Sequence, residues 1–543
     1  MITLILIALI ASILYSLLIF RPKNFPPGPP CLPLVGTLPF VPSKNVHFTM
    51  VKKWINDYGP VVGLMFGSHP AVAVIGAKQV MEVLRRDEFQ GRPYTFNAKH
   101  RSFNKRLGFF FTDGPFWQEQ RRFTLRHLRD LGFGKKSLEG IIVDEAEVLF
   151  KKLLNVEIQE TMVIINIWSV LSDPGHWGDP EVFRPDRFLD CNGKFVKDEW
   201  TQGSGTILTL LSFVDIQMYG LFKISALNVI SGVMSGMRYA RDDEELQALV
   251  NNLDELVRRS FRSGKISNIF PILKRLFPRI TGSNEIMYYI KNAYNFIQRK
   301  ITEHKQVLNE NNPRDFIDAY LIEMQKGNSN GNAIFTEEGL IVTCHDFFVA
   351  GGDTTNNTLV FCLLYMILHP QVQNAVQEEL DSVVGQDRRP SVEDRQRLHY
   401  VNAVISEVMR INPVVPLTVP HRVTKDTNLH GYTIPKDTMV LINLWSVHHD
   451  RGHWGDPEVF RPERFLDENR NFVKDEWIIS FGAGKRMCLG EAMARNTIFL
   501  FFTSLLQEFL FSLPEDDPPP QTLPLPGMTM APQPFRVKIT RRI

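Results

Sequence analysis

Cysteine is scarce in this 543-residue sequence, and its five copies are scattered. They stand at positions 31, 191, 344, 362 and 488, an odd number without a CxxC pair. This spacing argues against a disulfide framework and against a CxxC zinc site. An excess of one charge is also missing, and a formal net charge of +2 does not indicate a nucleic-acid-binding protein. Neither GxGxxG nor GxxxxGK followed by Ser or Thr occurs between a strand and a helix, so no nucleotide-binding fingerprint is present.

The N-terminus holds a long apolar run. Ile2 to Phe20 carries no charge, and Arg21, Pro22 and Lys23 follow at once. This length spans a bilayer, and no convincing cleavage site of a signal peptide follows it. Residues 1–20 are therefore expected to be a transmembrane anchor, with the chain beyond the positive charges facing the cytosol. Residues 21–30 are rich in proline and are expected to form a stiff hinge.

Helical periodicity dominates the rest of the chain, residues 31–543, after a hairpin pattern from Pro60 to Ile75. The fold class predicted is mainly α with small β-sheets. The stretch from Glu337 to Leu368 is long and apolar, but Ala350-Gly351-Gly352-Asp353-Thr354-Thr355 should break its middle because glycine and threonine oppose a regular helix. The other helices are expected at Phe116 to Asp130, Lys136 to Leu154, Gln217 to Met237, Asp243 to Arg262, Glu285 to Asn309, Pro370 to Val384, Val392 to Arg395, Leu398 to Ile411 and Met487 to Glu508.

One segment of the chain occurs twice. Residues 161–200 align with residues 438–477 without gaps, and 31 of the 40 positions are identical. Two copies do not make a solenoid, which needs several stacked units. Residues 161–200 are therefore interpreted as an inserted partial duplicate, arising from a local insertion or a misassembled coding sequence, and are expected to form an exposed, poorly packed excursion.

The chemistry is indicated by a loop near the C-terminus, Phe481-Gly482-Ala483-Gly484-Lys485-Arg486-Met487-Cys488-Leu489-Gly490. Its glycines allow a tight turn in which backbone N–H groups and the start of the next helix stabilise a Cys488 thiolate. The loop resembles the haem-binding pattern FxxGxRxCxG of cytochromes P450 at every fixed position. The resemblance implies the cytochrome P450 fold, a haem b cofactor (iron protoporphyrin IX) with Cys488 as its axial ligand, and cofactor contacts from Phe481, Gly484, Arg486 and Gly490. A thiolate ligand favours O–O bond cleavage.

Further segments resemble the same family in the same order. Glu407-Val408-Met409-Arg410 is similar to its ExxR helix motif, and Arg464 in Phe460 to Phe465 matches the third member of that structural ion network. Ala350 to Thr355 resembles the oxygen-activating motif, in which Thr354 would hold water and Asp353 would relay protons. The two glycines would let the helix widen over the iron.

Haem propionates would be held by several donors. Trp117 and Arg121 match the family's WxxxR pattern, and both are hydrogen-bond donors. His421 lies where microsomal relatives donate to a propionate, with Arg422 beside it as an alternative and Arg92 as a weaker candidate upstream.

The resemblance is nearest to the microsomal branch with drug- and steroid-oxidising members, and it is compatible with this chain being an arthropod member of that branch. It implies a monooxygenase that inserts one atom of O2 into a lipophilic small molecule (steroid, lipid, terpenoid or xenobiotic), at the endoplasmic reticulum membrane with its catalytic domain facing the cytosol. The expected partners are NADPH-cytochrome P450 reductase, docked on a basic patch with Arg121, Arg122, Arg126 and Arg129, and cytochrome b5. Thr95 to Gly114, the region after Met237 and Val414 to Val419 would select the substrate.

Two other functions remain open from the sequence. A haem-thiolate isomerase or dehydratase would need no reductase, but such enzymes generally lack the Asp353–Thr354 pair. A non-catalytic haem- or lipid-binding membrane protein would result if the insertion disrupts the fold.

Overall fold

The structure is a computed structural model that describes residues 21–42, 44–132, 136–155, 214–218, 220–269, 283–329, 334–515 and 517–542. The anchor predicted at residues 1–20 and the duplicate at residues 161–200 lie outside these residues. Among the described residues, no single helix is both long and apolar enough to cross a membrane. The bent pair Glu337–Leu368 and Pro370–Val383, at 109°, passes that test by length and composition.

Helices make up most of the described chain. The longer ones are α4(Ala77–Arg85), α6(Gly114–Asp130), α7(Lys136–Asn155), α11(Lys223–Ser235), α12(Glu244–Ile269), α14(Ser283–Val307), α15(Phe316–Ser329), α16(Glu337–Leu368), α17(Pro370–Val383), α18(His399–Ile411) and α21(Glu491–Glu508). The short ones are η1(Leu38–Phe40), α2(Val46–Thr49), η2(Met50–Trp54), α3(Ile55–Tyr58), η3(Asp87–Phe89), α5(Phe96–Arg101), η7(Val392–Gln396), α19(Trp445–His448), α20(Arg451–Trp454), η8(Pro462–Phe465) and η9(Gly484–Arg486).

The strands form three small sheets. The largest has the order β1-β2-β7-β4, in which β1(Val61–Phe66) and β2(His69–Val74) are the hairpin predicted from the sequence. Strand β2 pairs in parallel with β7(Met439–Ile442), and β7 pairs antiparallel with β4(His421–Arg422). The others are β3(Val214–Gln217)-β9(Arg536–Arg541)-β8(Phe509–Ser512) and the pair β5(Thr427–Leu429)-β6(Tyr432–Ile434). The mainly helical class with small sheets is confirmed.

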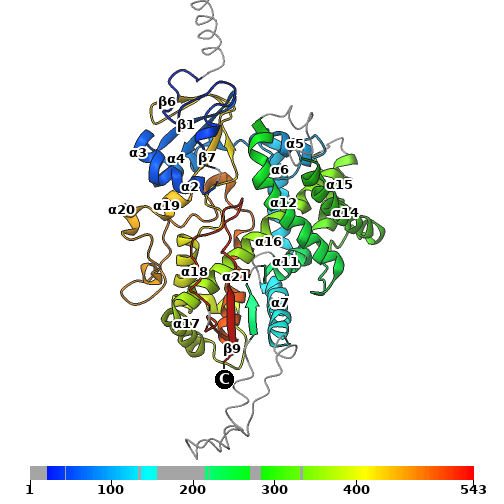
Figure 1. The fold of residues 1–543 in the computed structure, drawn as a ribbon. Helices are drawn as coiled ribbons and strands as arrows, with labels where there is room; N and C mark the ends of the chain where they lie inside the picture. The colour runs from blue at the N-terminus through cyan, green and yellow to red at the C-terminus, as the bar shows by residue number, and fades with distance from the viewer. Residues whose placement is uncertain are drawn as a thin grey trace, which may run out of the picture.

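Helix α16 is the centre of the molecule. Figure 1 shows it between the sheet region around β1 and β7 and the helices α5, α6, α12, α14 and α15. Nearly all of its residues are buried, as expected for a helix that is apolar all round. Thr336 caps its N-terminus by accepting a hydrogen bond from the Gly339 N–H. Helices α11, α14, α18 and α21 pack around α16. This packing fixes the position of the middle turns of α16, which line the site described below.

Two expectations about these elements are wrong. The interruption predicted within α16 is absent, since residues 337–368 form one continuous helix. Gly351 and Gly352 instead let α11 approach closely, because a Cβ at Gly351 would lie 2.3 Å from Ile230 Cδ1 and one at Gly352 would lie 3.1 Å from Leu227 Cδ2. The helix predicted from Gln217 begins only at Lys223, because residues 214–217 pair with β9 near the C-terminus.

Candidate active site

A cavity of about 1120 Å³ lies against the middle of α16 and ends at the cysteine loop. Its walls are mainly apolar and come from the chain before α6, from α12 and α14, from α16, and from residues 414–419. Phe109, Phe110 and Phe111 stand together in one wall. The segments 95–114 and 414–419, predicted to select a substrate, therefore both line it.

The cysteine loop is held by its own backbone. The Gly482 N–H donates to the Ile479 carbonyl over 2.7 Å, and the Cys488 N–H donates to the Phe481 carbonyl over 2.9 Å. Gly484 has a φ of +70°, and a Cβ there would lie 2.1 Å from the Leu84 carbonyl oxygen at the end of α4. Only glycine combines this backbone conformation with this close approach. The loop is therefore fastened to α4 at Gly484, six residues before Gly490 and the start of α21.

The Cys488 side chain faces the cavity. Burial raises the pKa of its thiol, the Gly490 backbone N–H lowers it, Glu491 raises it and Arg121 lowers it. The net shift is upward, so the loop by itself favours the neutral thiol. A bound metal cation deprotonates a coordinating thiol outright. Cys344 and Cys362 are buried within α16, which raises the pKa of both thiols and makes them packing residues.

Three predicted cofactor residues gather beside the loop. The Arg486 guanidinium lies 3.7 Å from the centre of the Trp117 ring, and that of Arg121 lies 5.6 Å from it. Arg486 donates to the carbonyls of Gln90 and Thr112, each over 2.9 Å. Arg121 donates to the Met487 carbonyl over 2.8 Å. Helix α6 and the cysteine loop thus place two guanidiniums and an indole on the cavity wall.

Arg92 and His421 extend this group of donors. Arg92 is buried and donates to the carbonyls of Val419 and Pro420 over 2.6 and 3.0 Å. His421 Nδ1 lies 2.7 Å from the Phe89 carbonyl, which can only accept, so Nδ1 carries a hydrogen. Burial, Arg92 and Arg486 hold the pKa of His421 well below its usual range. In the neutral ring Nε2 carries no hydrogen and can only accept. It can donate to a ligand only if a nearby anion raises the pKa enough for the ring to be protonated.

These residues fit a ligand that carries carboxylates and a metal. Within the described residues, Arg486 Nη1 and Arg92 Nε are buried without a hydrogen-bond partner. Burial lowers the pKa of Arg486 to about 10; Asp113 opposes this, and Arg121 and Arg106 add to it. An anion beside these guanidiniums would relieve both the repulsion and the missing hydrogen bonds. Haem would fit this site, because its two propionates would meet the arginines and its iron would meet the Cys488 sulfur.

The middle of α16 forms the wall near the cysteine loop. Thr354 lines the cavity, and its hydroxyl donates to the Ala350 carbonyl over 2.7 Å. Asp353 lies 3.1 Å from Lys223 Nζ of α11, which also pairs with Asp254 of α12 over 2.5 Å. Burial raises the pKa of Asp254 although Lys223 opposes this. Lys223 was not predicted from the sequence, because no motif includes it.

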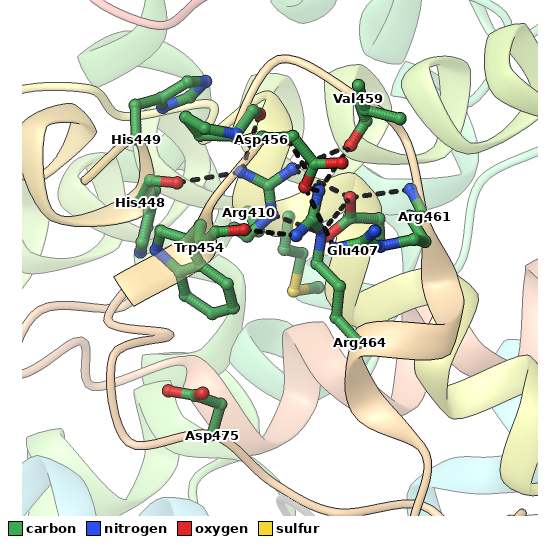
Figure 2. A network of polar contacts seen from close by, with 12 residues as sticks. Glu407, Arg410, His448, His449, Trp454, Asp456, Val459, Arg461, Arg464 and Asp475 are labelled. Carbon is green, nitrogen blue, oxygen red and sulfur yellow. Dashed lines mark hydrogen bonds and ion pairs between the residues drawn. The ribbon is translucent and has the colours of Figure 1, made fainter. Parts of the chain in front are cut away.

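Glu407, Arg410 and Arg464 meet in one buried network, shown in Figure 2. Arg410 Nε and Nη2 donate to the two Glu407 carboxylate oxygens over 2.6 and 2.8 Å. Arg464 Nε reaches the same carboxylate over 3.3 Å, and the Arg461 N–H does so over 2.9 Å. The remaining guanidinium N–H groups are bonded to carbonyls of His448, Trp454, Asp456, Pro457 and Val459. The network fixes α18 to the segment that leads to the cysteine loop.

The structure separates one residue from the basic patch predicted on α6. Arg122, Arg126 and Arg129 are exposed at spacings of four and three residues, which places them along one face of the helix. Arg121 points to the cysteine loop instead. Sequence reasoning also missed the pair of Arg101 with Asp346 and the neighbouring His345, because these residues come from elements far apart in the chain.

Comparison with known proteins agrees with this geometry. The family model for cytochrome P450 matches residues 26–160, 155–201 and 211–539. A farnesoate epoxidase of Bombyx mori is 34% identical over 517 residues, covering 94% of this chain and 93% of the relative. Cytochrome P450 2J3 of Rattus norvegicus and cytochrome P450 2J2 of Homo sapiens are each 36% identical, and each alignment covers 92% of this chain and 88% of the relative. The chain therefore belongs to the cytochrome P450 family and is a monooxygenase.

Proposed function

We propose that this monooxygenase inserts one atom of O2 into a lipophilic small molecule, with electrons from NADPH delivered by a reductase. The observation that carries the proposal is the cavity itself. It is lined mainly by apolar side chains and reaches Cys488 at one end, next to Thr354 and the group of arginines. Haem b bound there, with Cys488 as its axial ligand, would supply the O2 chemistry. Arg486, Arg121, Trp117, His421 and Phe481 would seat it.

Asp353 and Thr354 are proposed to supply protons. Thr354 faces the cavity, while the neighbouring Asp353 faces Lys223 and Asp254 on the other helices. A proton can therefore pass from the side of α12 to Asp353 and on to the Thr354 hydroxyl, by way of water. This acid–threonine pair argues for reductive O2 activation and against a reductase-free isomerase.

Electrons are proposed to arrive at the face of α6 that carries Arg122, Arg126 and Arg129. An acidic partner would be attracted to this exposed stripe. The Met487 side chain next to Cys488 is 40% exposed and offers an apolar contact nearby. NADPH-cytochrome P450 reductase is the expected docking partner, and cytochrome b5 is a second one.

The apolar residues 1–20 and the proline-rich residues 21–30 support a membrane location. We propose a transmembrane anchor and a hinge in the endoplasmic reticulum membrane, with the catalytic domain on the cytosolic side. A substrate that partitions into lipid would then reach the apolar cavity from the membrane. The similarity to a farnesoate epoxidase makes acyclic terpenoids the first compounds to test, before steroids and foreign compounds.

The duplicated segment is proposed to be an insertion that is not part of the catalytic fold. The family model matches residues 155–201 separately from the two long segments on either side. The downstream copy contains Arg464, and the Glu407 carboxylate accepts hydrogen bonds from Arg410, Arg461 and Arg464. The copy at residues 438–477 is therefore the one that takes part in the structural ion network.

The experiment that tests the function is the carbon monoxide difference spectrum of the reduced protein, with and without residues 161–200. A strongly red-shifted Soret band in both preparations is expected, and Cys488→Ser should abolish it. A band only in the deletion would mean that the insertion prevents haem seating. No band in either would overturn the proposal and leave a lipid-binding membrane protein. NADPH consumption that depends on added reductase and substrate completes the test.

A further inference from the structure

The cavity has a polar region away from the cysteine loop. His345 of α16 forms part of its wall and is 1% exposed. Both ring nitrogens are buried, and neither has a hydrogen-bond partner within the described residues. The ring stands edge to face with Tyr294 of α14, with centroids 5.2 Å apart. A buried imidazole without a single hydrogen bond is destabilising, so its presence beside a cavity points to a ligand that completes it.

The surroundings of His345 favour an uncharged ligand group. Burial and the nearby Arg101 hold the pKa of His345 well below its usual range, so the ring is neutral and offers one donor and one acceptor. Arg101 lines the cavity but is already paired with Asp346, which also accepts from the Phe109 N–H over 2.9 Å. A carboxylate would therefore meet the buried Asp346 charge as well as the cation. An uncharged carbonyl or hydroxyl group would not be repelled by the Asp346 carboxylate and would not compete with it for Arg101.

The ring can reach such a group by a small movement. The χ2 torsion of histidine is broad, so a modest rotation presents Nδ1 or Nε2 to the cavity. Tyr294 limits the rotation on one side, since its hydroxyl is bonded to the Arg101 carbonyl.

The positions of His345 and Thr354 on α16 set the shape of a ligand that contacts both. Nine residues separate them, which is roughly 13 Å along the helix axis and about two and a half turns, so the two side chains leave the helix on nearly opposite sides. Both line the same cavity, so a ligand that contacts both must be long enough to curve around the helix. A compact substrate could not contact both places at once.

We propose that His345 is a specificity-determining residue that hydrogen-bonds an uncharged carbonyl or hydroxyl at one end of an elongated lipophilic substrate. This inference rests on the proposed function for the oxidation at the other end. The partner class is a neutral oxygen group, such as an ester, and not a free carboxylate.

The test measures binding of three matched probes to the full-length protein in detergent: methyl dodecanoate, dodecanoate and dodecane. Calorimetric Kd values are compared for the wild type, His345→Leu, His345→Gln and the control Met287→Leu, which alters the apolar wall. The wild type should bind the ester more tightly than either other probe. His345→Leu should reduce the ester's advantage over dodecane by about tenfold, because the hydrogen bond is lost. His345→Gln should retain most of it, and Met287→Leu should not change the ratio.

An ester advantage that is equal in the wild type and His345→Leu would overturn the inference. Tighter binding of dodecanoate than of the ester at pH 8 would also overturn it and point to Arg101 as an anion site. If His345→Leu does not fold, the wild-type preference and the His345→Gln ratio still decide. Since calorimetry does not depend on turnover, a retained ester preference without a carbon monoxide band would leave the subsite standing while the proposed function fails. Product analysis adds a second readout: oxidation near the far end of methyl dodecanoate should spread along the chain in His345→Leu.

Discussion

Replacing Glu407 by glutamine should remove a large part of the stability of this protein. Glutamine has nearly the same shape but no charge, and its amide NH2 would face the N–H groups of Arg410 that now donate over 2.6 and 2.8 Å. Both Arg410 and Arg464 would stay in place, with side chains 0% and 5% exposed, and only Arg464 would keep a carboxylate partner, the partly exposed Asp456. Removing one partner of a buried ion pair typically destabilises by about 3–5 kcal/mol. The free energy of unfolding of a typical domain is only about 5–15 kcal/mol.

A matched control exists close by in the chain. Glu458 pairs with Arg451 at 2.6 Å, but these side chains are 61% and 73% exposed. Glu458→Gln should therefore change the free energy of unfolding by less than about 1 kcal/mol. Urea unfolding of the full-length protein in detergent, followed by tryptophan fluorescence and by Soret absorbance, measures both variants. If Glu407→Gln were no more destabilising than Glu458→Gln, the argument from burial and unpaired charge would be wrong.

Three further changes test other parts of the structure. Gly484→Ala should greatly lower the yield of haem-loaded protein because its Cβ would lie 2.1 Å from the Leu84 carbonyl oxygen, whereas Gly431→Ala, also at positive φ but with open space around it, should have a small effect. Burial lowers the pKa of His304, but the bonded Asp315 carboxylate outweighs burial and raises the pKa overall. The ion pair of protonated His304 with Asp315 therefore stabilises the folded protein fully below about pH 6.5, and this stabilisation is lost as the pH rises through the raised pKa. The difference in melting temperature between the wild type and His304→Gln should therefore shrink from pH 6 to pH 9, and a constant difference would contradict the assignment. Arg126→Glu should raise the KM for reductase several-fold at low salt, with an effect that fades at high salt and leaves the carbon monoxide band unchanged.

The elements that the sequence predicted well are those with strong local patterns. The bounds of α16 follow from its apolar length, and the β1–β2 hairpin follows from alternation and glycine. Helix α15 was missed although a local pattern was present: Asp315 accepts from the Asp318 N–H over 3.0 Å and caps it. Strand β3 was mistaken for the start of a helix because its partner β9 lies more than 300 residues further along the chain. No local pattern contains such a pairing.

The residues of the site also fall into those that a local sequence pattern predicts and those that it does not. Cys488, Arg486 and Trp117 belong to motifs, so their positions in the sequence were enough to bring them together as candidates. Lys223 and His345 belong to no motif, and their importance depends on what other elements place beside them. The glycines of α16 were recognised, but their packing against Leu227 and Ile230 could not be read from α16 alone.

The two anchored ends on either side of residues 156–213 bear on how this fold could accommodate the proposed insertion of forty residues. Helix α7 packs against α21 before this segment, and β3 is hydrogen-bonded to β9 after it, so both ends of the connection are held by the catalytic fold itself. Without the duplicate the connection would have 58 minus 40, or 18, residues. Lengthening a closed loop from 18 to 58 residues raises its closure entropy penalty by only about 1 kcal/mol, because the penalty grows with the logarithm of length. By this measure alone, an insertion of the proposed length between these two anchored ends would cost the catalytic fold little stability.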